Sequence, residues 1–287
     1  MERQLILRGV LAGAVAGILA FIFARTFAEP QIQAAIDYEA GRDAAQNALD
    51  KAVGLPTDMG GSDIIGRTVQ ANLGIGVGMI AFGAAMGALY AVGYALACGR
   101  TGNLKPRTLA MLVALGGFLS LYLIPFIKYP ANPPAIGHEE TIRDRSGLYL
   151  LMIGTSIVFL VVAVWLGQRL KPRFGTWNAA LLAALACAVA VGVVMAILPS
   201  LGELKDNVQA YGHHATETPQ PLTNSQGQIV YPGFPADVLF SFRIYSIAAQ
   251  AILWTAIGLC FAPLAERLLG RPGQPAAAAG NAAATVI

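Results

Sequence analysis

The sequence predicts an all-α fold, a polytopic integral membrane bundle of about six transmembrane helices with both termini in the cytoplasm. The chain is 56% hydrophobic and only 12% charged, whereas a soluble domain carries about 25% charged residues. Its apolar residues also gather into blocks of about 18 or more nearly chargeless residues, which is typical of membrane helices. These blocks are too long and too rich in Ala, Gly and Leu for the strands of a soluble β protein.

Six apolar blocks are each long enough to cross a hydrocarbon core of about 30 Å at a rise of about 1.5 Å per residue. The predicted spans are 5–28, 68–98, 108–127, 147–168, 177–198 and 238–261. Polar loops are expected at 29–66, 128–145 and 199–237, and short links at 99–107 and 169–176. Residues 1–270 are therefore expected to form one membrane domain, and the Ala-, Gly- and Pro-rich tail 271–287 is predicted to be disordered. The first block is interpreted as a retained span rather than a signal peptide, because it is long and no clear A-x-A site follows it.

The two short links set the orientation, because both are basic and neither contains an acidic residue. Their basic residues are Arg100, Lys105, Arg107, Arg169, Lys171 and Arg173. The positive-inside rule assigns these links, and with them both termini, to the cytoplasm. The three long loops then face outward, and they and their edges hold all acidic residues except Glu2 and Glu266. No basic cluster is large enough for nucleic acid, so the lipid bilayer is the expected surrounding and nucleic acid is excluded as a partner.

Glycines spaced by four residues predict close helix packing. They are Gly9, Gly13 and Gly17 in the first span, and two pairs in the second, Gly74 with Gly78 and Gly83 with Gly87. Residues four apart share one face of a helix, and small residues on such a face let two membrane helices approach closely.

Arg25 is the charged residue placed at the greatest cost, near the outer end of the first span. An arginine at the centre of a span costs about 2.5–3.5 kcal/mol on insertion scales, and less near the surface. Glu29 lies four residues later and is expected to pair with it on one helix face. Two interpretations stay open: an ionic gate on an ion path, or an interfacial anchor that snorkels to the surface.

Other polar residues within the spans need partners in lipid and are expected to face the bundle interior. They are Asn72, Tyr90, Tyr94, Arg243 and Gln250. A faint threefold repeat accompanies them, because each returning helix carries an arginine near its outer start: Arg67, Arg145 and Arg243. Arg25, Arg145 and Arg243 are expected to bind carboxylates or helix ends as structural locks.

Histidines in the outer loops give a weak indication of metal. His138 precedes Glu139 and Glu140, and the pair His213 and His214 has Glu217 nearby. Imidazole and carboxylate together suit divalent first-row metals, although solvated loop residues explain the same pattern. No HExxH, G-x-S-x-G or Ser-His-Asp pattern is present, so no catalytic residues and no bound cofactor are expected. The three cysteines are expected to be small buried hydrophobes.

The most unusual segment is the run Lys128–Pro134, Lys-Tyr-Pro-Ala-Asn-Pro-Pro. Its prolines fix φ and bar a helix, so the loop has a fixed path at the outer end of the bundle. It is expected either to cap the bundle or to position Lys128 and Asn132 beside an entrance.

With these motifs the chain resembles CbtA, a bacterial family of predicted cobalt transporter subunits, over nearly its whole length. The matching features are Arg8-Gly9, Phe23-Ala24-Arg25, Glu29-Pro30, Ala35-Ile36, Glu39, the run from Pro125 to Pro134, Arg145, Tyr149, Trp177-Asn178, Phe234-Pro235, Phe242-Arg243, Ser246, Gln250 and Trp254. The resemblance implies uptake of cobalt (Co²⁺) for cobalamin synthesis across the bacterial cytoplasmic (inner) membrane. It also implies a small CbtB-like partner with one span and a histidine-rich end. The segment with His213 and His214 looks like an insertion relative to the family pattern.

The leading hypothesis is a membrane protein that moves Co²⁺ inward as part of such a transporter. Arg25, Glu29, Lys128 and Asn132 would shape an outer mouth, where carboxylates such as Glu39 and Glu139 concentrate cations. Asn72, Gln250 and the tyrosines would line the path. The alternative is a non-transporting membrane scaffold that assembles or regulates a separate permease, which the glycine faces and the scarcity of metal ligands favour.

Overall fold

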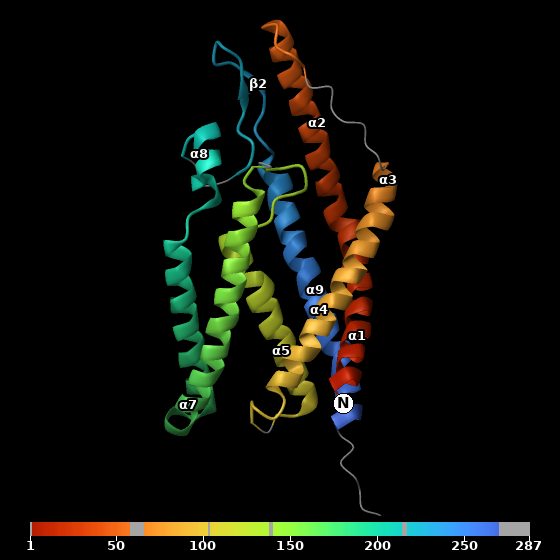
Figure 1. Cartoon of the computed structure of the whole chain (residues 1–287), viewed down its shortest axis with the longest axis vertical. Helices are drawn as coiled ribbons and strands as arrows, with labels where there is room; N and C mark the ends of the chain where they lie inside the picture. The colour runs from red at the N-terminus through yellow and green to blue at the C-terminus, as the bar shows by residue number, and fades with distance from the viewer. Residues whose placement is uncertain (1, 58–65, 103, 138–139, 214–216, 270–287) are drawn as a thin grey trace, which may run out of the picture.

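Long helices that run along one axis of the molecule confirm the predicted helical membrane bundle (Figure 1). The computed structural model describes residues 2–57, 66–102, 104–137, 140–213 and 217–269. Within that part of the chain, five helical segments are long and apolar enough to cross a membrane: Glu2–Ala52, Gln70–Ala97, Pro106–Lys128, Ile142–Glu203 and Ala236–Leu268. The predicted tail 271–287 lies outside the described residues.

Several of these segments are built from α-helix and π-helix in succession. The first contains α1 (Glu2–Phe23), η1 (Ala24–Ala28) and α2 (Glu29–Ala52); the second, α3 (Arg67–Val69), η2 (Gln70–Gly74) and α4 (Ile75–Ala97); the third, α5 (Pro106–Gly117), η3 (Phe118–Leu123) and α6 (Ile124–Lys128). The last is α9 (Ala236–Leu269). The second and third spans agree with the predicted boundaries within two residues.

The fourth and fifth predicted spans both lie in α7 (Ile142–Ile197), which turns back on itself. The turn is at Gly175, whose φ of 75° and ψ of 171° are not helical. Glycine is almost alone in adopting this backbone conformation. The two halves of α7 run side by side in Figure 1, and a Cβ built at Gly167 would lie 3.5 Å from the Cβ of Ala183. The expected link 169–176 is therefore helical except at Gly175, and the bundle keeps six crossings.

The expected polar loop at 29–66 is wrong over its first half, because α2 continues the first helix to Ala52. The sequence of α2 is rich in Ala, Gln and Glu, which favour helix. Pro30 falls in its first turn, directly after the π-helical turns of η1, and does not end the helix. Figure 1 shows α2 extending beyond the outer ends of α3 and α9. Polarity here therefore indicates a helix that is exposed to water, and not the end of the helix.

The outer loop 199–237 is also partly ordered, and it packs against α2. It contains a 3-10 turn (Leu201–Glu203), α8 (Lys205–Tyr211) and a small antiparallel hairpin of β1 (Leu222–Thr223) and β2 (Ile229–Tyr231). Tyr38 of α2 packs against the rings of Tyr231 and Phe234, at centroid distances of 5.3 and 5.1 Å. Its hydroxyl donates a hydrogen bond to the carbonyl of Pro232. This second small core fixes α2 to the ordered part of loop 199–237, here called the outer cap.

The main core joins α1, α4, α5 and α9. Tyr90 and Tyr94 lie within it, edge-on to the ring of Phe261. The Tyr90 hydroxyl donates to the carbonyl of Ala110 at 2.8 Å, and the Tyr94 hydroxyl donates to that of Pro106 at 3.4 Å. These buried tyrosines therefore join α4 to α5 within the main core.

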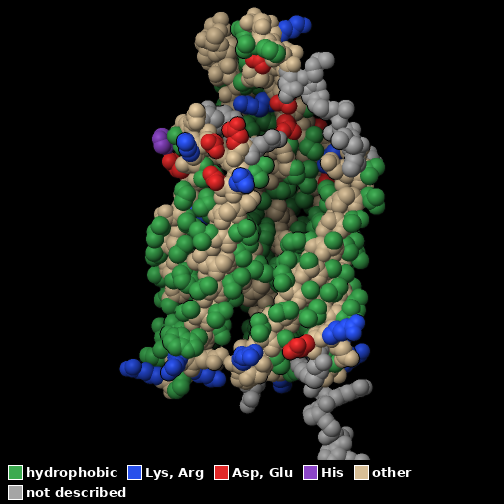
Figure 2. Space-filling view, in the orientation of Figure 1, with side chains coloured by type: hydrophobic (Ala, Val, Ile, Leu, Met, Phe, Trp, Pro, Cys, Tyr) green, Lys and Arg blue, Asp and Glu red, His purple; other side chains and the backbone are tan. Residues whose placement is uncertain are grey.

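Charges are separated along the long axis (Figure 2). A broad apolar band covers the middle of the molecule. Lys and Arg gather at the end that holds the N-terminus and the turn of α7, whereas Asp and Glu gather mostly at the opposite end. This separation agrees with the orientation that the positive-inside rule assigns.

Candidate functional site

The two glycine-bearing helices α1 and α4 meet along a face that repeats every four residues. Gly9 and Gly13 lie against Gly83 and Gly87 so closely that an added Cβ would collide with the opposite backbone. A Cβ at Gly17 would lie 2.6 Å from the carbonyl oxygen of Met79. The predicted close packing is thus confirmed for these positions.

The prediction is wrong for Gly74 and Gly78. A Cβ at Gly78 would meet nothing within 4 Å, and one at Gly74 would meet only the carbonyl oxygen of Val69 at 4.0 Å. Both residues therefore lie off the face on which α1 and α4 meet, although their spacing in the sequence is the same.

Further outward the same face becomes aromatic and then polar. Phe21 packs over Gly76, where an added Cβ would lie 3.2 Å from the ring. Four residues later the Nε of Arg25 donates to the Oδ1 of Asn72 at 2.8 Å. Glycine contacts hold the inner part of this helix pair, and polar side chains bridge its outer part.

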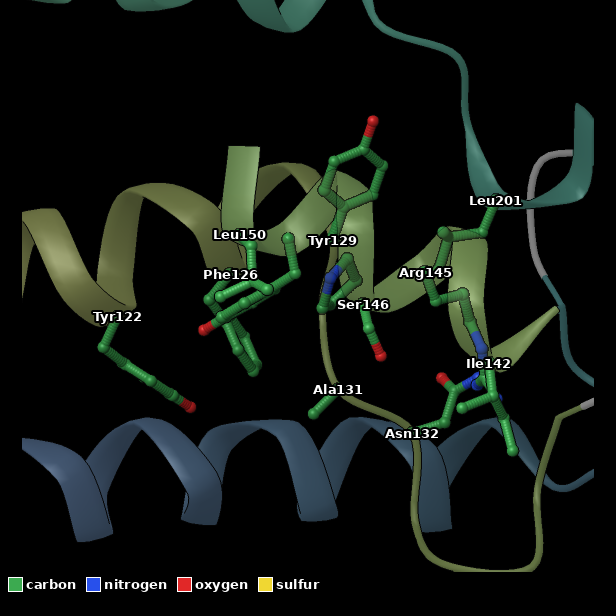
Figure 3. A pocket seen from close by; sticks show the side chains of 12 residues that line it. Tyr122, Phe126, Tyr129, Ala131, Asn132, Ile142, Arg145, Ser146, Leu150 and Leu201 are labelled. Carbon is green, nitrogen blue, oxygen red and sulfur yellow. The ribbon is translucent and has the colours of Figure 1, made fainter. Parts of the chain in front are cut away.

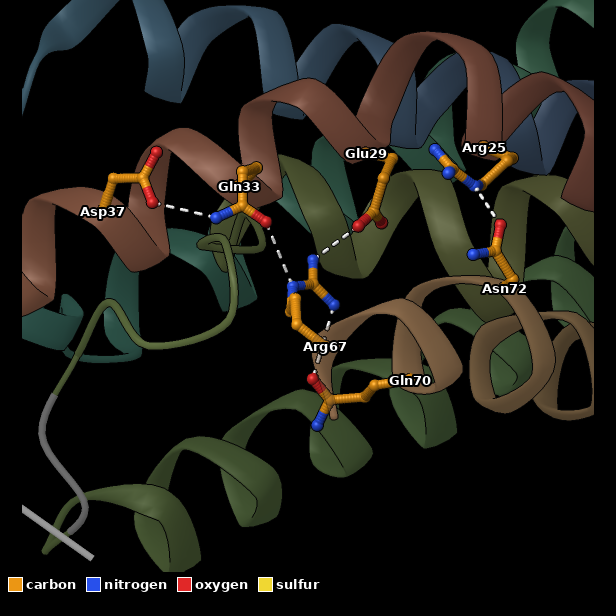
Figure 4. Close-up of polar contacts among 7 residues, drawn as sticks. All are labelled: Arg25, Glu29, Gln33, Asp37, Arg67, Gln70 and Asn72. Carbon is orange, nitrogen blue, oxygen red and sulfur yellow. Dashed lines mark hydrogen bonds and ion pairs between the residues drawn. The ribbon is translucent and has the colours of Figure 1, made fainter. Parts of the chain in front are cut away.

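The next position on this face is Glu29, which pairs with Arg67 at 2.5 Å and not with Arg25 as predicted (Figure 4). Arg25 lies within η1, where backbone hydrogen bonds join residues five apart, as from the N–H of Glu29 to the carbonyl of Ala24. The side chains of Arg25 and Glu29 therefore do not have the α-helical spacing that the predicted pair assumes. Arg67 also donates from Nε to Gln33 at 3.2 Å and from Nη1 to Gln70 at 3.3 Å.

These side chains surround a cavity of about 300 Å³, here called the arginine pocket. Its lining residues are Arg25, Glu29, Pro30, Gln33, Arg67, Ala71 and Asn72. The Glu29 side chain is only 9% exposed, and Arg67 is its ion-pair partner. The pocket lies where η1 and η2 face each other, and such π-helical segments occur frequently at functional sites.

A larger cavity of about 520 Å³, here called the tyrosine pocket, lies between the third span, the Lys128–Pro134 run and the first turns of α7 (Figure 3). Its lining residues are Tyr122, Phe126, Tyr129, Pro130, Ala131, Asn132, Ile142, Arg145, Ser146, Tyr149, Leu150 and Leu201. The third π-helical segment, η3, contributes Tyr122, whose hydroxyl is buried and has no hydrogen-bond partner within the described part of the chain.

Hydrogen bonds hold the Lys128–Pro134 run against its neighbours. The Tyr129 hydroxyl donates to the carbonyl of Pro199 at 2.9 Å, and burial raises the pKa of this phenol, which keeps it a neutral donor. Arg243 of α9 donates to the carbonyl of Ala131 at 3.2 Å and to the Oδ1 of Asn132 at 2.9 Å. Lys128 is not among the lining residues, and its ammonium lies 5.7 Å from the ring centroid of Tyr129.

Arg145 connects the tyrosine pocket to the outer cap. Its Nη1 lies 2.9 Å from the Oε2 of Glu217, a carboxylate whose side chain is fully buried. The other oxygen of Glu217 accepts hydrogen bonds from the Thr141 hydroxyl and from the Nδ2 of Asn207, the latter at 3.1 Å. The positive charge of Arg145 at the pocket is therefore balanced.

A family model described as "Probable cobalt transporter subunit (CbtA)" matches residues 2–266, which include both pockets and all six crossings. The chain belongs to the CbtA family. No curated protein and no solved structure matches it. The family confirms the resemblance noted in the sequence, and it makes this chain a probable cobalt transporter subunit in a multi-pass membrane fold.

The histidine sites expected for metal are not assembled in the described part of this CbtA-family chain. His213 lies 3.0 Å from the Oε2 of Glu203 and is highly exposed, whereas Glu217 pairs with Arg145 instead. His138, Glu139 and His214 lie outside the described residues. Among the residues that the structure describes, no group of three or more His, Cys, Asp or Glu side chains is placed to hold a metal ion.

The three arginines of the faint repeat each reach another part of the chain. Arg67 binds Glu29, Arg145 binds Glu217, and Arg243 binds Asn132. Structural locks were expected for Arg25, Arg145 and Arg243, but among the described residues only Arg145 of these three pairs with a carboxylate. Glu39 lies exposed on α2, and Gln250 is half-buried in α9; neither lines the two pockets.

Several pocket residues were absent from the predicted site, namely Gln33, Arg67, Tyr122, Ser146 and Tyr149. The position of Arg67 in the repeat was a usable signal for its role. Tyr149 was one of the family-matching positions. Gln33, Tyr122 and Ser146 carried no local signal, because ordinary polar residues become site residues only through the packing that surrounds them.

Proposed function

We propose that this chain is the membrane body of a cobalt uptake transporter and that Co²⁺ enters through the tyrosine pocket. The observation that carries the proposal is the position of the family-matching run from Pro125 to Pro134, which forms one wall of the tyrosine pocket at the outer end. The acidic outer loops raise the local concentration of cations beside this entrance.

The lining of the tyrosine pocket favours passage over tight binding. Its polar lining side chains have neutral oxygens, except for Arg145, whose charge Glu217 balances; the neutral ones are Tyr122, Tyr129, Asn132, Ser146 and Tyr149. Among the described lining residues there is no carboxylate, histidine or thiol to hold a transition metal strongly. A conducting site must bind its ion weakly enough to release it, and neutral oxygens acting on a hydrated ion satisfy that condition.

High-affinity capture then falls to a partner. Membership in a transporter-subunit family supports the existence of such a partner. A small single-span protein with a histidine-rich end would supply the imidazole ligands that the described part of this chain does not gather in one place. In this proposal the transporter lies in the cytoplasmic membrane of a bacterium and supplies cobalt for cobalamin synthesis.

Uptake of radioactive Co²⁺ tests the path in cells that lack other cobalt importers and express this chain with its partner. The variant Ser146→Trp fills the tyrosine pocket and is expected to lower uptake at least tenfold. The matched control Leu151→Trp adds the same ring five residues later in α7, at a position 52% exposed to the surroundings, and should retain uptake. Normal uptake by Ser146→Trp at equal membrane abundance would exclude this pocket as the entrance.

A scaffold that assembles a separate permease is the second candidate, and the packed core favours it. The tyrosines that would line a path through α4 and α5 instead close that interface with hydrogen bonds. Purified chain in vesicles separates the two candidates, first alone and then with its partner. Co²⁺ flux in either preparation supports transport, whereas absence of flux in both, with uptake restored only by a third protein, supports the scaffold.

A further inference from the structure

The arginine pocket has a charge that suits an anion and not a cation. Its described lining residues include two arginines and one glutamate. Arg67 is the ion-pair partner of Glu29. Arg25 is bound to a neutral amide oxygen of Asn72, and among the described residues it makes no ion pair within 4.0 Å. The pocket therefore carries one net positive charge.

Arg25 also retains unused donors. A guanidinium group has five N–H bonds in a planar fork, and among the described residues the Nε bond to Asn72 is the one that Arg25 engages. Figure 4 shows Arg25 reaching across to Asn72 and Arg67 reaching across to Glu29 and Gln33. The Nη ends of an arginine fork match two oxygens of one phosphate.

The position of the arginine pocket along the long axis of the bundle indicates whether it faces lipid or water. On its inner side lie the apolar contacts of Phe21 and Gly76, and exposed Val69 and Leu73 flank it on the second span. On its outer side begins the polar helix α2, which stands clear of the apolar band in Figures 1 and 2. The pocket thus lies at the boundary between hydrocarbon and water, where phospholipid headgroups are the abundant anions.

We propose that the arginine pocket binds a phosphate group, and that its source is the headgroup of an outer-leaflet phospholipid. The phosphodiester of such a lipid carries one negative charge, which matches the net charge of the pocket. Arg25 would hold the phosphate with its Nη groups, and the acyl chains would lie along the exposed Val69 and Leu73. The ion pair with Arg67 keeps Glu29 from repelling the lipid phosphate.

Native mass spectrometry of the purified full chain tests the proposal, with phosphatidylglycerol as the probe and without cobalt, so that the result is independent of transport. Wild type is expected to retain lipid, and Arg25→Gln to lower its affinity at least tenfold. Arg42→Gln is the matched control, because Arg42 lies on the same helical segment and is likewise bound to one neutral oxygen, the carbonyl of Gln220. It lies about 25 Å further along the same helix at about 1.5 Å per residue, and should bind lipid like wild type.

Two further arms decide the source of the phosphate. Inorganic phosphate at millimolar concentration should not displace the lipid from wild type. If phosphate displaces the lipid from wild type but has no such effect on Arg25→Gln, the lipid source is overturned and the pocket is a site for free anions. Equal lipid binding by wild type, Arg25→Gln and Arg42→Gln would overturn the site itself. Matching circular dichroism and thermal unfolding without added lipid exclude misfolding of Arg25→Gln, and Arg25→Lys should restore only part of the affinity because lysine lacks the planar fork.

Discussion

At the scale of single residues, the buried carboxylate of Glu217 is the most consequential group in the outer cap. It joins Arg145 and Thr141 at the start of α7 to Asn207 of α8. The substitution Glu217→Gln removes the charge that balances Arg145. Breaking a buried ion pair from one side costs about 3–5 kcal/mol, and the lower value is expected here because the Arg145 side chain is 26% exposed. Chemical unfolding of the purified protein measures the loss.

Glu203→Gln is the control for that prediction. Glu203 pairs with His213, but both side chains are exposed, at 45% and 76%. Exposed pairs contribute about 0–1 kcal/mol, so this variant should unfold nearly like wild type. Equal stability of the Glu217 and Glu203 variants would show that the buried network does not hold the cap.

Residue-level reasoning from the sequence singled out residues that the fold brings together, but it did not find their partners. Arg25, Glu29 and Asn72 line one cavity, although the first two were expected at an outer mouth and Asn72 on a path. Their pairing depended on the π-helical segment η1 and on Arg67, which is distant in sequence. Spacing along one regular helix carries no information on either.

At the scale of elements, the α1–α4 contact rests on glycines that no larger residue can replace. In Gly87→Ala the new methyl group would collide with the backbone of α1 at Gly9 and Gly13. Because backbone must move, a loss of about 1–3 kcal/mol or more is expected. Gly78→Ala on the same helix adds the same methyl group where nothing lies within 4 Å, and should be neutral or slightly stabilising through helix propensity. Thermal unfolding in detergent checks both, and a Gly87→Ala variant as stable as Gly78→Ala would contradict the packing.

Elements within lipid were predicted well because hydropathy reports the solvent that surrounds a helix. The second span was expected at 68–98 and is helical from Arg67 to Ala97. Outside lipid, hydropathy does not distinguish a polar helix from a polar loop. On hydropathy, α2 is therefore assigned to a loop, although its composition favours helix. At the turn of α7 the expected link was too long: the sequence predicted eight non-helical residues, 169–176, but only Gly175, with its positive φ, departs from helix.

At the scale of the whole molecule, two parts with different packing enclose the proposed entrance. One is the core of α1, α4, α5 and α9, and the other is the hairpin of α7. The tyrosine pocket lies between the third span and α7, while Arg243 of α9 holds its loop. On the other side of α9, Tyr245 packs against Phe23 and Phe27 beside η1. The helix α9 therefore contacts the loop of the tyrosine pocket on one side and the residues beside the arginine pocket on the other.

The orientation of the molecule gives the last prediction. Entry of Co²⁺ requires the tyrosine pocket to open outside the cell, and the proposed lipid site requires the arginine pocket to lie at the outer leaflet. A cysteine introduced at Gln226, in the turn between β1 and β2, should react with a membrane-impermeant maleimide in intact cells. A cysteine at Arg173, in the basic turn region of α7, should react only after the membrane is permeabilised. Both variants are made after Cys98, Cys187 and Cys260 are replaced by alanine, so that the introduced thiol is the only one labelled. Lys and Arg gather at the end that holds the turn of α7, and the positive-inside rule places that end in the cytoplasm and the acidic outer cap outside. The opposite pattern would place the acidic cap and both pockets in the cytoplasm, where the tyrosine pocket would serve export or release and not uptake.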